Sequence, residues 1–248
     1  MAVLNAGAPS PLLLLGDHAG RTIPRALGRL GLTDAQLGLH IALDIGIEGL
    51  GAELSALLGA TFIHQRYSRL VIDCNRQPGS QGAILAVSDG VPIPGNADLS
   101  SEAVQARVAE IYQPYQDEIS RSLDLRSGRP TILIALHSFT PSMQGSDRPW
   151  RLGVLHRHDS AFSTAVLALM RAELGDAIGD NQPYAMDGTD NTIPLHADSR
   201  GLDYLELEVR QDLLTTPHAQ RSLARWLAPL LLAALKATTS DGVTGADK

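Results

Sequence analysis

The chain has 248 residues, of which 44% are hydrophobic and 19% are charged, and its formal net charge at pH 7 is −7. The acidic balance argues against nucleic acids or anionic membranes as partners, because both attract basic surfaces. No apolar run reaches the roughly 18 residues that cross a bilayer. The single cysteine, Cys74, excludes an internal disulfide. We therefore expect a cytoplasmic protein that acts on a small molecule.

The length and composition fit one globular unit. We predict a single catalytic domain over residues 1–240 and a flexible tail over residues 241–248, where small and polar residues end the chain. A monomer and a homodimer are both compatible with the sequence.

Strand and helix patterns alternate along the chain. An apolar run at 11–16 predicts a first strand, and Thr33-Asp34-Ala35-Gln36 predicts a capping box that begins a helix ending at Gly59. Further strands are expected at 61–64, 69–74, 131–137, 152–156 and 204–210, further helices at 101–124 (kinked at Pro114), 160–174 and 218–236, and long loops at 78–95 and 138–151. This alternation predicts a three-layer αβα domain of the α/β class, with a central mixed, largely parallel sheet.

Two of the apolar strands end in histidines. Pro11-Leu12-Leu13-Leu14-Leu15-Gly16 leads into Asp17-His18, and the run from Leu133 to Leu136 leads into His137. Ligands of open α/β sheets bind outside the carboxyl ends of the strands. We therefore expect the two histidines to share one site, although a core histidine satisfied by the backbone is the alternative for each of them.

Several side chains could complete a metal site with these histidines. Two histidines and a carboxylate, with water in the fourth position, form a common catalytic zinc arrangement. His40 and Asp44 have the i, i+4 spacing of one helical face, so they are a second possible ligand pair. The candidates for ligands and for a base are His18, Asp44, Glu48, His137 and Glu208.

The strand at 204–210 places Glu206, Glu208 and Arg210 on one face. One of the two carboxylates could act as a general base. The alternative is an edge strand whose polar face carries surface ion pairs.

Arg69 and Arg76 flank the apolar segment that we expect to form a buried strand. A guanidinium group is suited to hold a substrate carboxylate, although arginines are also common on solvated surfaces. Asp73 would oppose ionisation of the neighbouring Cys74, so a packing role is expected for this cysteine. The chain contains no Gly-x-Ser-x-Gly motif, which disfavours a serine hydrolase.

A series of motifs from about residue 12 to residue 215 resembles, in order, the N-formylglutamate amidohydrolase family, which is related to the zinc carboxypeptidases. The motifs are Asp17-His18-Ala19-Gly20, His40-Ile41-Ala42-Leu43-Asp44-Ile45-Gly46, Tyr67-Ser68-Arg69-Leu70, Asp73-Cys74-Asn75-Arg76, Ser88-Asp89-Gly90, His137-Ser138-Phe139-Thr140-Pro141, Arg148-Pro149-Trp150, Gly179-Asp180-Asn181 and Glu208-Val209-Arg210-Gln211-Asp212-Leu213. The resemblance implies a zinc-exopeptidase-like fold.

The resemblance also implies a metal site with one zinc ion per chain. His18 and His137 match zinc ligands of the carboxypeptidases, whose glutamate ligand follows the first histidine by three residues. This chain has Arg21 at that position. We take Asp44 as the third ligand, with His40 and Glu48 as alternatives.

Roles for the other residues follow from the same resemblance. Glu208 would be the general base, and Asn75 with Arg76 would hold the substrate α-carboxylate. Arg69 or Arg148 would stabilise the oxyanion. A further cation should meet the side-chain carboxylate of the substrate, and the candidates are Arg66, Arg69, Arg148 and Arg151.

The implied activity is hydrolysis of N-formyl-L-glutamate to formate and L-glutamate by zinc-activated water. Two alternatives stay open. One is a zinc deacylase or peptidase with another N-acyl or amide substrate, and the other is a metal-free module that binds amino-acid carboxylates.

Overall fold

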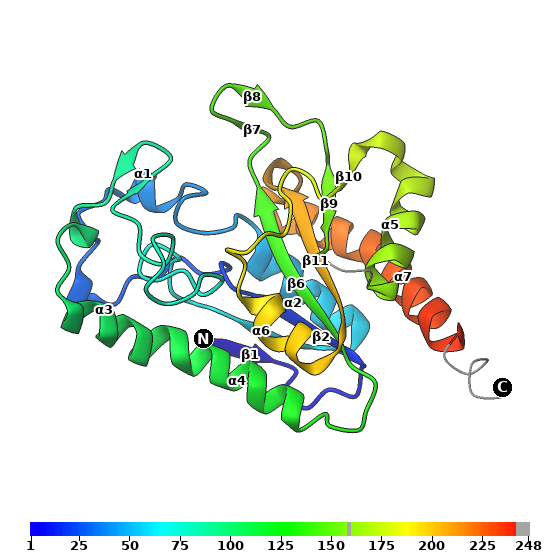
Figure 1. Cartoon of the computed structure of the whole chain (residues 1–248). Helices are drawn as coiled ribbons and strands as arrows, with labels where there is room; N and C mark the ends of the chain where they lie inside the picture. The colour runs from blue at the N-terminus through cyan, green and yellow to red at the C-terminus, as the bar shows by residue number, and fades with distance from the viewer. Residues whose placement is uncertain (158–159, 242–248) are drawn as a thin grey trace.

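The computed structural model describes residues 1–157 and 160–241, and its centre is a seven-stranded sheet in the order β1-β3-β2-β6-β11-β9-β10 (Figure 1). The strands of this sheet are β1 (Ala2–Leu4), β2 (Leu12–Gly16), β3 (Thr61–His64), β6 (Ile132–Phe139), β9 (Leu152–Leu155), β10 (Ile178–Asp180) and β11 (Asp203–Arg210). Strands β3, β2, β6 and β11 run parallel to one another, whereas β9 is antiparallel to β11, and β1 to β3. The predicted mixed, largely parallel sheet is confirmed.

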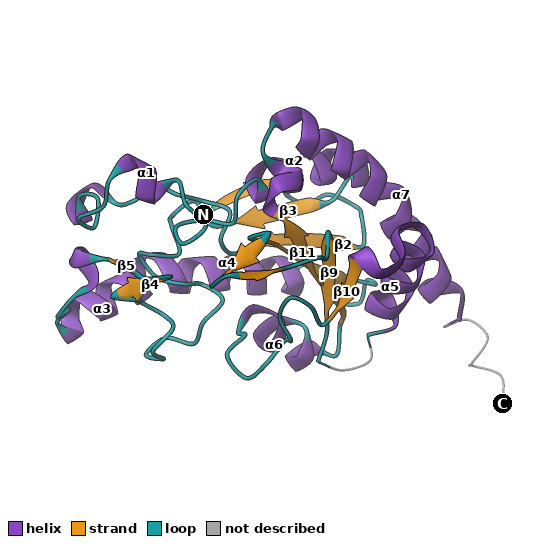
Figure 2. Cartoon of the chain, turned by 90° about the horizontal axis from the view of Figure 1, so that it is seen from above, coloured by secondary structure: helices purple, strands orange, loops and turns teal. Residues whose placement is uncertain are grey.

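Helices cover both faces of the sheet and complete the three layers (Figure 2). The α-helices are α1 (Asp34–Leu37), α2 (Ile47–Leu58), α3 (Ser101–Arg107), α4 (Gln113–Asp124), α5 (Ala161–Leu174), α6 (Thr192–His196) and α7 (Pro217–Asp241). Short 3-10 helices lie at Arg25–Leu27, Pro94–Asn96, Gly175–Ala177, Asp198–Arg200 and Gln211–Leu214, and two small hairpins pair β4 (Val87–Ser88) with β5 (Val91–Pro92) and β7 (Ser142–Met143) with β8 (Ser146–Asp147).

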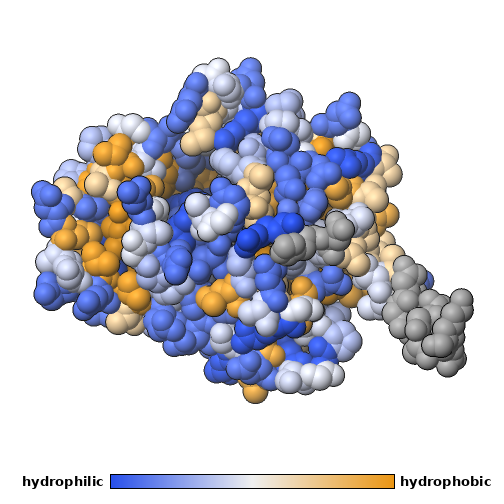
Figure 3. Space-filling view, in the orientation of Figure 1, coloured by the Kyte–Doolittle hydropathy of each residue, from blue (hydrophilic) through white to orange (hydrophobic). Residues whose placement is uncertain are grey.

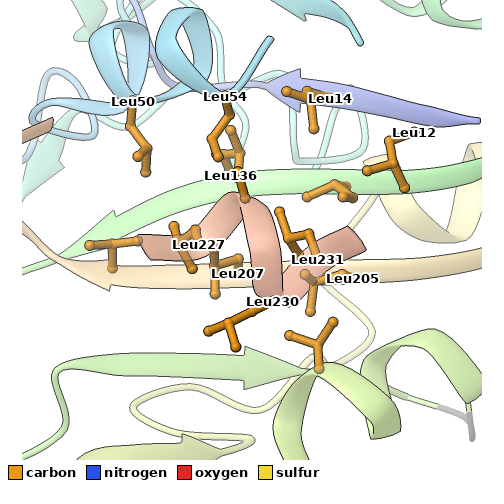
Figure 4. Close-up of a cluster of buried hydrophobic side chains, with 14 of the residues drawn as sticks. Leu12, Leu14, Leu50, Leu54, Leu136, Leu205, Leu207, Leu227, Leu230 and Leu231 are labelled. Carbon is orange, nitrogen blue, oxygen red and sulfur yellow. The ribbon is translucent and has the colours of Figure 1, made fainter. Parts of the chain in front are cut away.

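The alternation of side chains along the strands divides the core between the two faces. Leu12 and Leu14 of β2 and Leu136 of β6 pack against α2 and α7 on one face (Figure 4). Leu13 and Leu15 point to the other face, which α4 covers. Burial of each such leucine contributes about 1.5–3 kcal/mol relative to exposure, so the central strands are firmly held. Their carboxyl ends can therefore position functional side chains with little freedom.

The helix predicted from residue 33 to Gly59 is wrong in its middle. Thr33 caps α1 as expected and Gly59 ends α2 in a left-handed conformation. Between the two helices the chain turns irregularly from Gly38 to Gly46, and Gly46 has a φ of +83°. A side chain at Gly46 would also meet Leu214 at 2.3 Å. The interruption carries Asp44 to the end of the sheet instead of leaving it on a helix face.

Other boundaries also differ from the predictions. Residues 70–74 are buried, as expected for an apolar run, but the segment 69–74 forms turns rather than a strand. The helix at 101–124 is divided by a π-helical turn at Val108–Tyr112, just before the predicted kink at Pro114. The loop at 78–95 contains the β4–β5 hairpin, and the loop at 138–151 contains the β7–β8 hairpin. Most of the predicted tail, residues 242–248, lies outside the described residues.

The edge-strand interpretation of 204–210 is wrong, because β11 lies between β6 and β9. Its glutamates, Glu206 and Glu208, are therefore buried beside the neighbouring strands.

The surface mixes polar and apolar side chains. Figure 3 shows mostly hydrophilic residues across the middle of one face, with hydrophobic residues gathered on the side where α1 and α3 lie. No helix within residues 1–157 and 160–241 combines the length and the apolar character that a bilayer crossing requires.

Candidate active site

The site lies where three neighbouring parallel strands end. His18 follows β2 by two residues, His137 is near the end of β6, and Glu208 is near the end of β11. Glu208 is directly opposite His137 in the pairing of β6 with β11. The sheet therefore brings all three side chains to one edge, as the apolar strand patterns predicted for the two histidines.

His18, Asp44 and His137 form a buried cluster. Oδ2 of Asp44 lies 3.0 Å from Nδ1 of His137 and 3.5 Å from Nδ1 of His18. One ligand atom from each of the three residues lies within 4.8 Å of the other two. Two imidazole nitrogens and a carboxylate oxygen are the donor set that a catalytic zinc ion takes.

Backbone hydrogen bonds hold Asp44 in this position. Its N–H donates to the carbonyl oxygen of His18 at 2.9 Å, and the N–H of Ser138 donates to its Oδ2 at 3.2 Å. The irregular segment before α2 is thus tied to the ends of both β2 and β6.

A second carboxylate lies behind each histidine. Nε2 of His18 is 2.7 Å from Oδ1 of Asp73, and Nε2 of His137 is 3.5 Å from Oδ2 of Asp17. The hydroxyl of Thr192 donates to the other oxygen of Asp17 at 2.9 Å. Histidines that bind metals usually donate their outer N–H to a carboxylate, as the short contact of His18 with Asp73 would allow. Both Nδ1 atoms are left facing Asp44, and Nδ1 of His18 is buried with no hydrogen-bond partner among the described residues. The cluster fits a divalent metal ion.

The pKa shifts in the metal-free cluster also fit a site for a cation. Burial alone would raise the pKa of Asp44, but the neighbouring His18, His137 and Arg69 hold this pKa far below its usual range. Burial alone would lower the pKa of His137, but the neighbouring carboxylates of Asp17 and Asp44 raise this pKa well above its usual value. In the metal-free protein, protons on the histidines thus compensate the negative charge of the buried carboxylates. A bound cation would supply this positive charge instead, and protons would be released.

Glu206 and Glu208 extend from the same face of β11 toward the cluster. Both are buried, and Oε2 of each has no hydrogen-bond partner among the described residues. Burial raises the pKa of each carboxyl to about 8. A buried carboxyl with a pKa near neutrality is suited to accept and return a proton.

Arg69 closes another side of the cluster. Its guanidinium lies 2.6 Å from Oδ2 of Asp73 and 3.3 Å from Oδ1 of Asp44, and about a quarter of the side chain (27%) is exposed. Arg69 is thus fixed by two carboxylates while it still faces the open cavity.

A cavity of about 450 Å³ opens over these side chains. Asn75 and Arg76 also line it. Oδ1 of Asn75 accepts hydrogen bonds from the N–H groups of Asn191 and Thr192, at 3.0 and 2.8 Å. Nη1 of Arg76 lies 3.1 Å from Oδ1 of Asp190. The cavity therefore combines a candidate metal site, a candidate base and cationic groups.

Comparisons with known proteins agree with this arrangement. The model of the N-formylglutamate amidohydrolase family matches residues 10–215. The chain belongs to this family. Its membership supports hydrolysis of an amide bond as the reaction class and confirms the resemblance found in the sequence.

Solved structures support the fold of this family member. A gene product from Agrobacterium tumefaciens is 37% identical with a TM-score of 0.92, and the match covers 96% of this chain and 95% of that one. The N-formylglutamate amidohydrolase from Ralstonia eutropha JMP134 is 20% identical with a TM-score of 0.69, over 96% of this chain and 98% of that one. No curated protein gives a significant match.

Most of the residues predicted for the site line the same cavity in this family member. They are His18, Arg69, Asp44, Asn75, Arg76, His137 and Glu208. Arg148 is at the rim instead, where its guanidinium stacks on the ring of Tyr184 at 4.7 Å and donates to the Tyr184 hydroxyl at 2.8 Å. Tyr184 itself lines the cavity.

The alternative third ligands lie elsewhere. Nε2 of His40 is 3.3 Å from Oδ2 of Asp89, at another part of the cavity wall. Glu48 is exposed on α2. Arg66 and Arg151 are exposed and are not among the described residues that line the cavity. Asp44 is therefore the carboxylate that the fold brings to the two histidines.

The sequence patterns assigned no part in the site to Asp17, Asp73, Thr192 or Tyr184. A signal existed for the two aspartates, since Asp17 directly precedes His18 and Asp73 begins a family motif. Cys74 is buried, and burial raises the pKa of its thiol, in agreement with a packing role.

Proposed function

We propose that the protein is a metal-dependent hydrolase that cleaves the amide bond of an N-acyl amino acid and holds one zinc ion per chain. His18, Asp44 and His137 would hold the metal. N-formyl-L-glutamate, cleaved to formate and L-glutamate, is the reference substrate, because the family is named for this reaction. The observation that carries the proposal is the cluster of three inward ligand atoms, backed by Asp17 and Asp73.

When bound, the metal would acidify a water molecule and polarise the acyl oxygen. The residues of the chain supply the other parts of the reaction. Glu208 takes the proton of the attacking water and later delivers it to the leaving amine nitrogen. Its buried position beside the cluster and its raised pKa of about 8 support this role.

Arginine and amide groups would bind the substrate and the developing charge. Arg69 faces the cavity beside Asp44, so it is placed to stabilise the oxyanion. Asn75 and Arg76 would hold the α-carboxylate. Because Oδ1 of Asn75 is occupied by two backbone N–H groups, its Nδ2 is the group left to donate to a ligand. Arg148 would act from the rim through its contact with Tyr184.

Formate release from N-formyl-L-glutamate and from other N-formyl amino acids tests the proposal. The zinc-loaded wild type should release formate, and the His137→Ala variant should lose both zinc and activity. His218→Ala is the matched control, since His218 lies on the exposed first turn of α7. Binding of N-acyl amino acids without hydrolysis, by a protein that holds no metal, would favour a carboxylate-binding module instead.

A further inference from the structure

Thr192, the first residue of α6, contacts both the metal side and the substrate side of the site. It is buried, with 1% of its surface exposed. Its hydroxyl donates to Oδ1 of Asp17 at 2.9 Å, and its N–H donates to Oδ1 of Asn75 at 2.8 Å. These contacts join residues that are 175 and 117 positions apart in the chain. One buried residue thus holds a support of a candidate metal ligand and a candidate substrate-binding amide.

On the metal side, Thr192 holds the carboxylate that faces His137. Oδ2 of Asp17 lies 3.5 Å from Nε2 of His137, and both atoms are buried with no hydrogen-bond partner among the described residues. A buried carboxylate costs free energy unless hydrogen bonds satisfy it. The hydroxyl of Thr192 supplies such a bond to one oxygen of Asp17 and leaves the other oxygen toward the imidazole. Loss of this hydroxyl would free Asp17 to turn away from His137.

On the substrate side, the segment that leads into α6 holds the two candidate groups for the α-carboxylate. Oδ1 of Asn75 accepts hydrogen bonds from the N–H groups of Asn191 and Thr192, at 3.0 and 2.8 Å. Oδ1 of Asp190 lies 3.1 Å from Nη1 of Arg76. Three consecutive residues therefore fix this side of the cavity, and Thr192 carries the connection to the metal side.

We infer that Thr192 is a positioning residue that joins the two sides of the site: its hydroxyl orients Asp17 behind a candidate metal ligand, and its N–H orients the Asn75 amide for the substrate. The inference rests on the proposed function and adds to it a residue that acts through its neighbours. Outer partners of metal-binding histidines fix the orientation of the ring, and their loss lowers metal affinity or activity. The two contacts can be separated, because a change of side chain removes the hydroxyl and keeps the N–H.

Thr192→Val removes the hydroxyl with little change in shape. We expect it to lower the affinity for zinc by about tenfold, at the lower end of the effect of outer partners, whereas Thr192→Ser should stay within about threefold of the wild type. Competition with a chromophoric chelator measures both affinities. Thr192→Ala should show the same loss and takes the place of the valine variant if that variant does not fold. Thr189→Val, at an exposed threonine three residues earlier, is the matched control and should bind zinc like the wild type.

The Michaelis constant separates the two contacts of Thr192. With zinc at saturation, Thr192→Val should leave KM within about twofold of the wild-type value, because the N–H still holds Asn75.

A double-mutant cycle distinguishes action through Asp17 from a general loss of packing. In the Asp17→Asn background the imidazole has already lost its carboxylate, so Thr192→Val should change the zinc affinity by less than about twofold. In the Asp73→Asn background, which affects the other histidine, Thr192→Val should still lower the affinity by about tenfold.

Several results would overturn the role of Thr192 and keep the proposed function, provided that the wild type binds zinc. They are wild-type zinc affinity in Thr192→Val, an equally large loss in Thr192→Ser, and a loss that persists in full in the Asp17→Asn background. A wild type that binds no zinc would overturn both the inference and the proposed metal site.

Discussion

Nε2 of His18 lies 2.7 Å from Oδ1 of Asp73, in a contact between residues 55 positions apart in the chain. This contact decides which imidazole nitrogen faces Asp44, because the outer nitrogen is occupied and the inner one is left for a ligand. Arg69 in turn holds the other oxygen of Asp73 at 2.6 Å. Asp73 is thus a positioning residue between a candidate ligand and a candidate oxyanion group.

Replacement of the Asp73 carboxylate should weaken metal binding, although Asp73 is not itself one of the three proposed ligands. We expect Asp73→Asn to lower the affinity for zinc by about 10- to 100-fold, because the imidazole loses its orientation and basicity. Competition with a chromophoric chelator measures the change. Asp89→Asn is the control, since Asp89 also lines the cavity but contacts His40. Wild-type affinity in Asp73→Asn would contradict the role of this residue.

Glu208→Gln should separate chemistry from metal binding. The amide cannot take the proton of water, so kcat should fall by about 10²- to 10⁴-fold. The zinc content should stay at the wild-type level, since Glu208 lies outside the ligand cluster. Asp212→Asn is the control. It removes a partly exposed ion pair with Arg210, the last residue of β11, and should leave kcat within about twofold. If the Glu208→Gln variant kept most of its activity, Glu208 would not be the general base.

The stability of the metal-free protein should depend on pH through Glu208. Burial raises the pKa of this carboxyl to about 8 in the folded chain, whereas an unfolded glutamate titrates near about 4.3. The folded chain thus binds the proton more tightly, so the stabilisation is full below the unfolded pKa and is lost as the pH rises toward the folded one. The free energy of unfolding of the wild type should therefore fall relative to that of Glu208→Gln by up to about 1.4 kcal/mol per pH unit over this range.

Urea denaturation of both metal-free proteins at about pH 5.5 and about pH 7.5 measures that difference. If the two proteins change in parallel between these conditions, Glu208 does not carry a raised pKa.

The turn that carries His18 should be sensitive to one added methyl group. A Cβ atom at Gly20 would lie 2.1 Å from the backbone carbonyl of Arg66, which a side-chain rotation cannot relieve. We expect Gly20→Ala to destabilise the protein by about 1–3 kcal/mol and to weaken zinc binding. Thermal unfolding and zinc titration measure both effects. Gly188→Ala, where nothing lies within 4 Å, should change neither. Equal behaviour of the two variants would show that the turn is free to adjust.

The strands that carry the site were predictable from the sequence because their signals are local. The apolar runs before His18 and His137, and the pattern around Glu208, correspond to β2, β6 and β11. The common edge then follows from the rule for parallel strands. The shared cavity was predictable for the same reason.

Features that depend on tertiary contacts were not predictable in this way. The apolar periodicity at 33–58 continues through a segment that the structure folds as turns, because contacts with β2 and β6 hold Asp44 there. The segment 69–74 has a strand composition, but the ion pairs of Arg69 and Asp73 hold it in turns around the cluster. The support of His137 by Asp17 and of His18 by Asp73 links separate elements, and no spacing in the sequence encodes it.

Metal stoichiometry tests the central claim most directly. The wild type and single variants of the cluster, His18→Ala, Asp44→Ala and His137→Ala, would be loaded with zinc, dialysed and analysed for bound metal, with His40→Ala as the matched control. We predict one zinc ion per chain in the wild type and in His40→Ala, and loss of the ion in each of the three cluster variants. A wild type that binds no zinc, or a zinc ion that survives in Asp44→Ala and is lost in His40→Ala, would contradict the account.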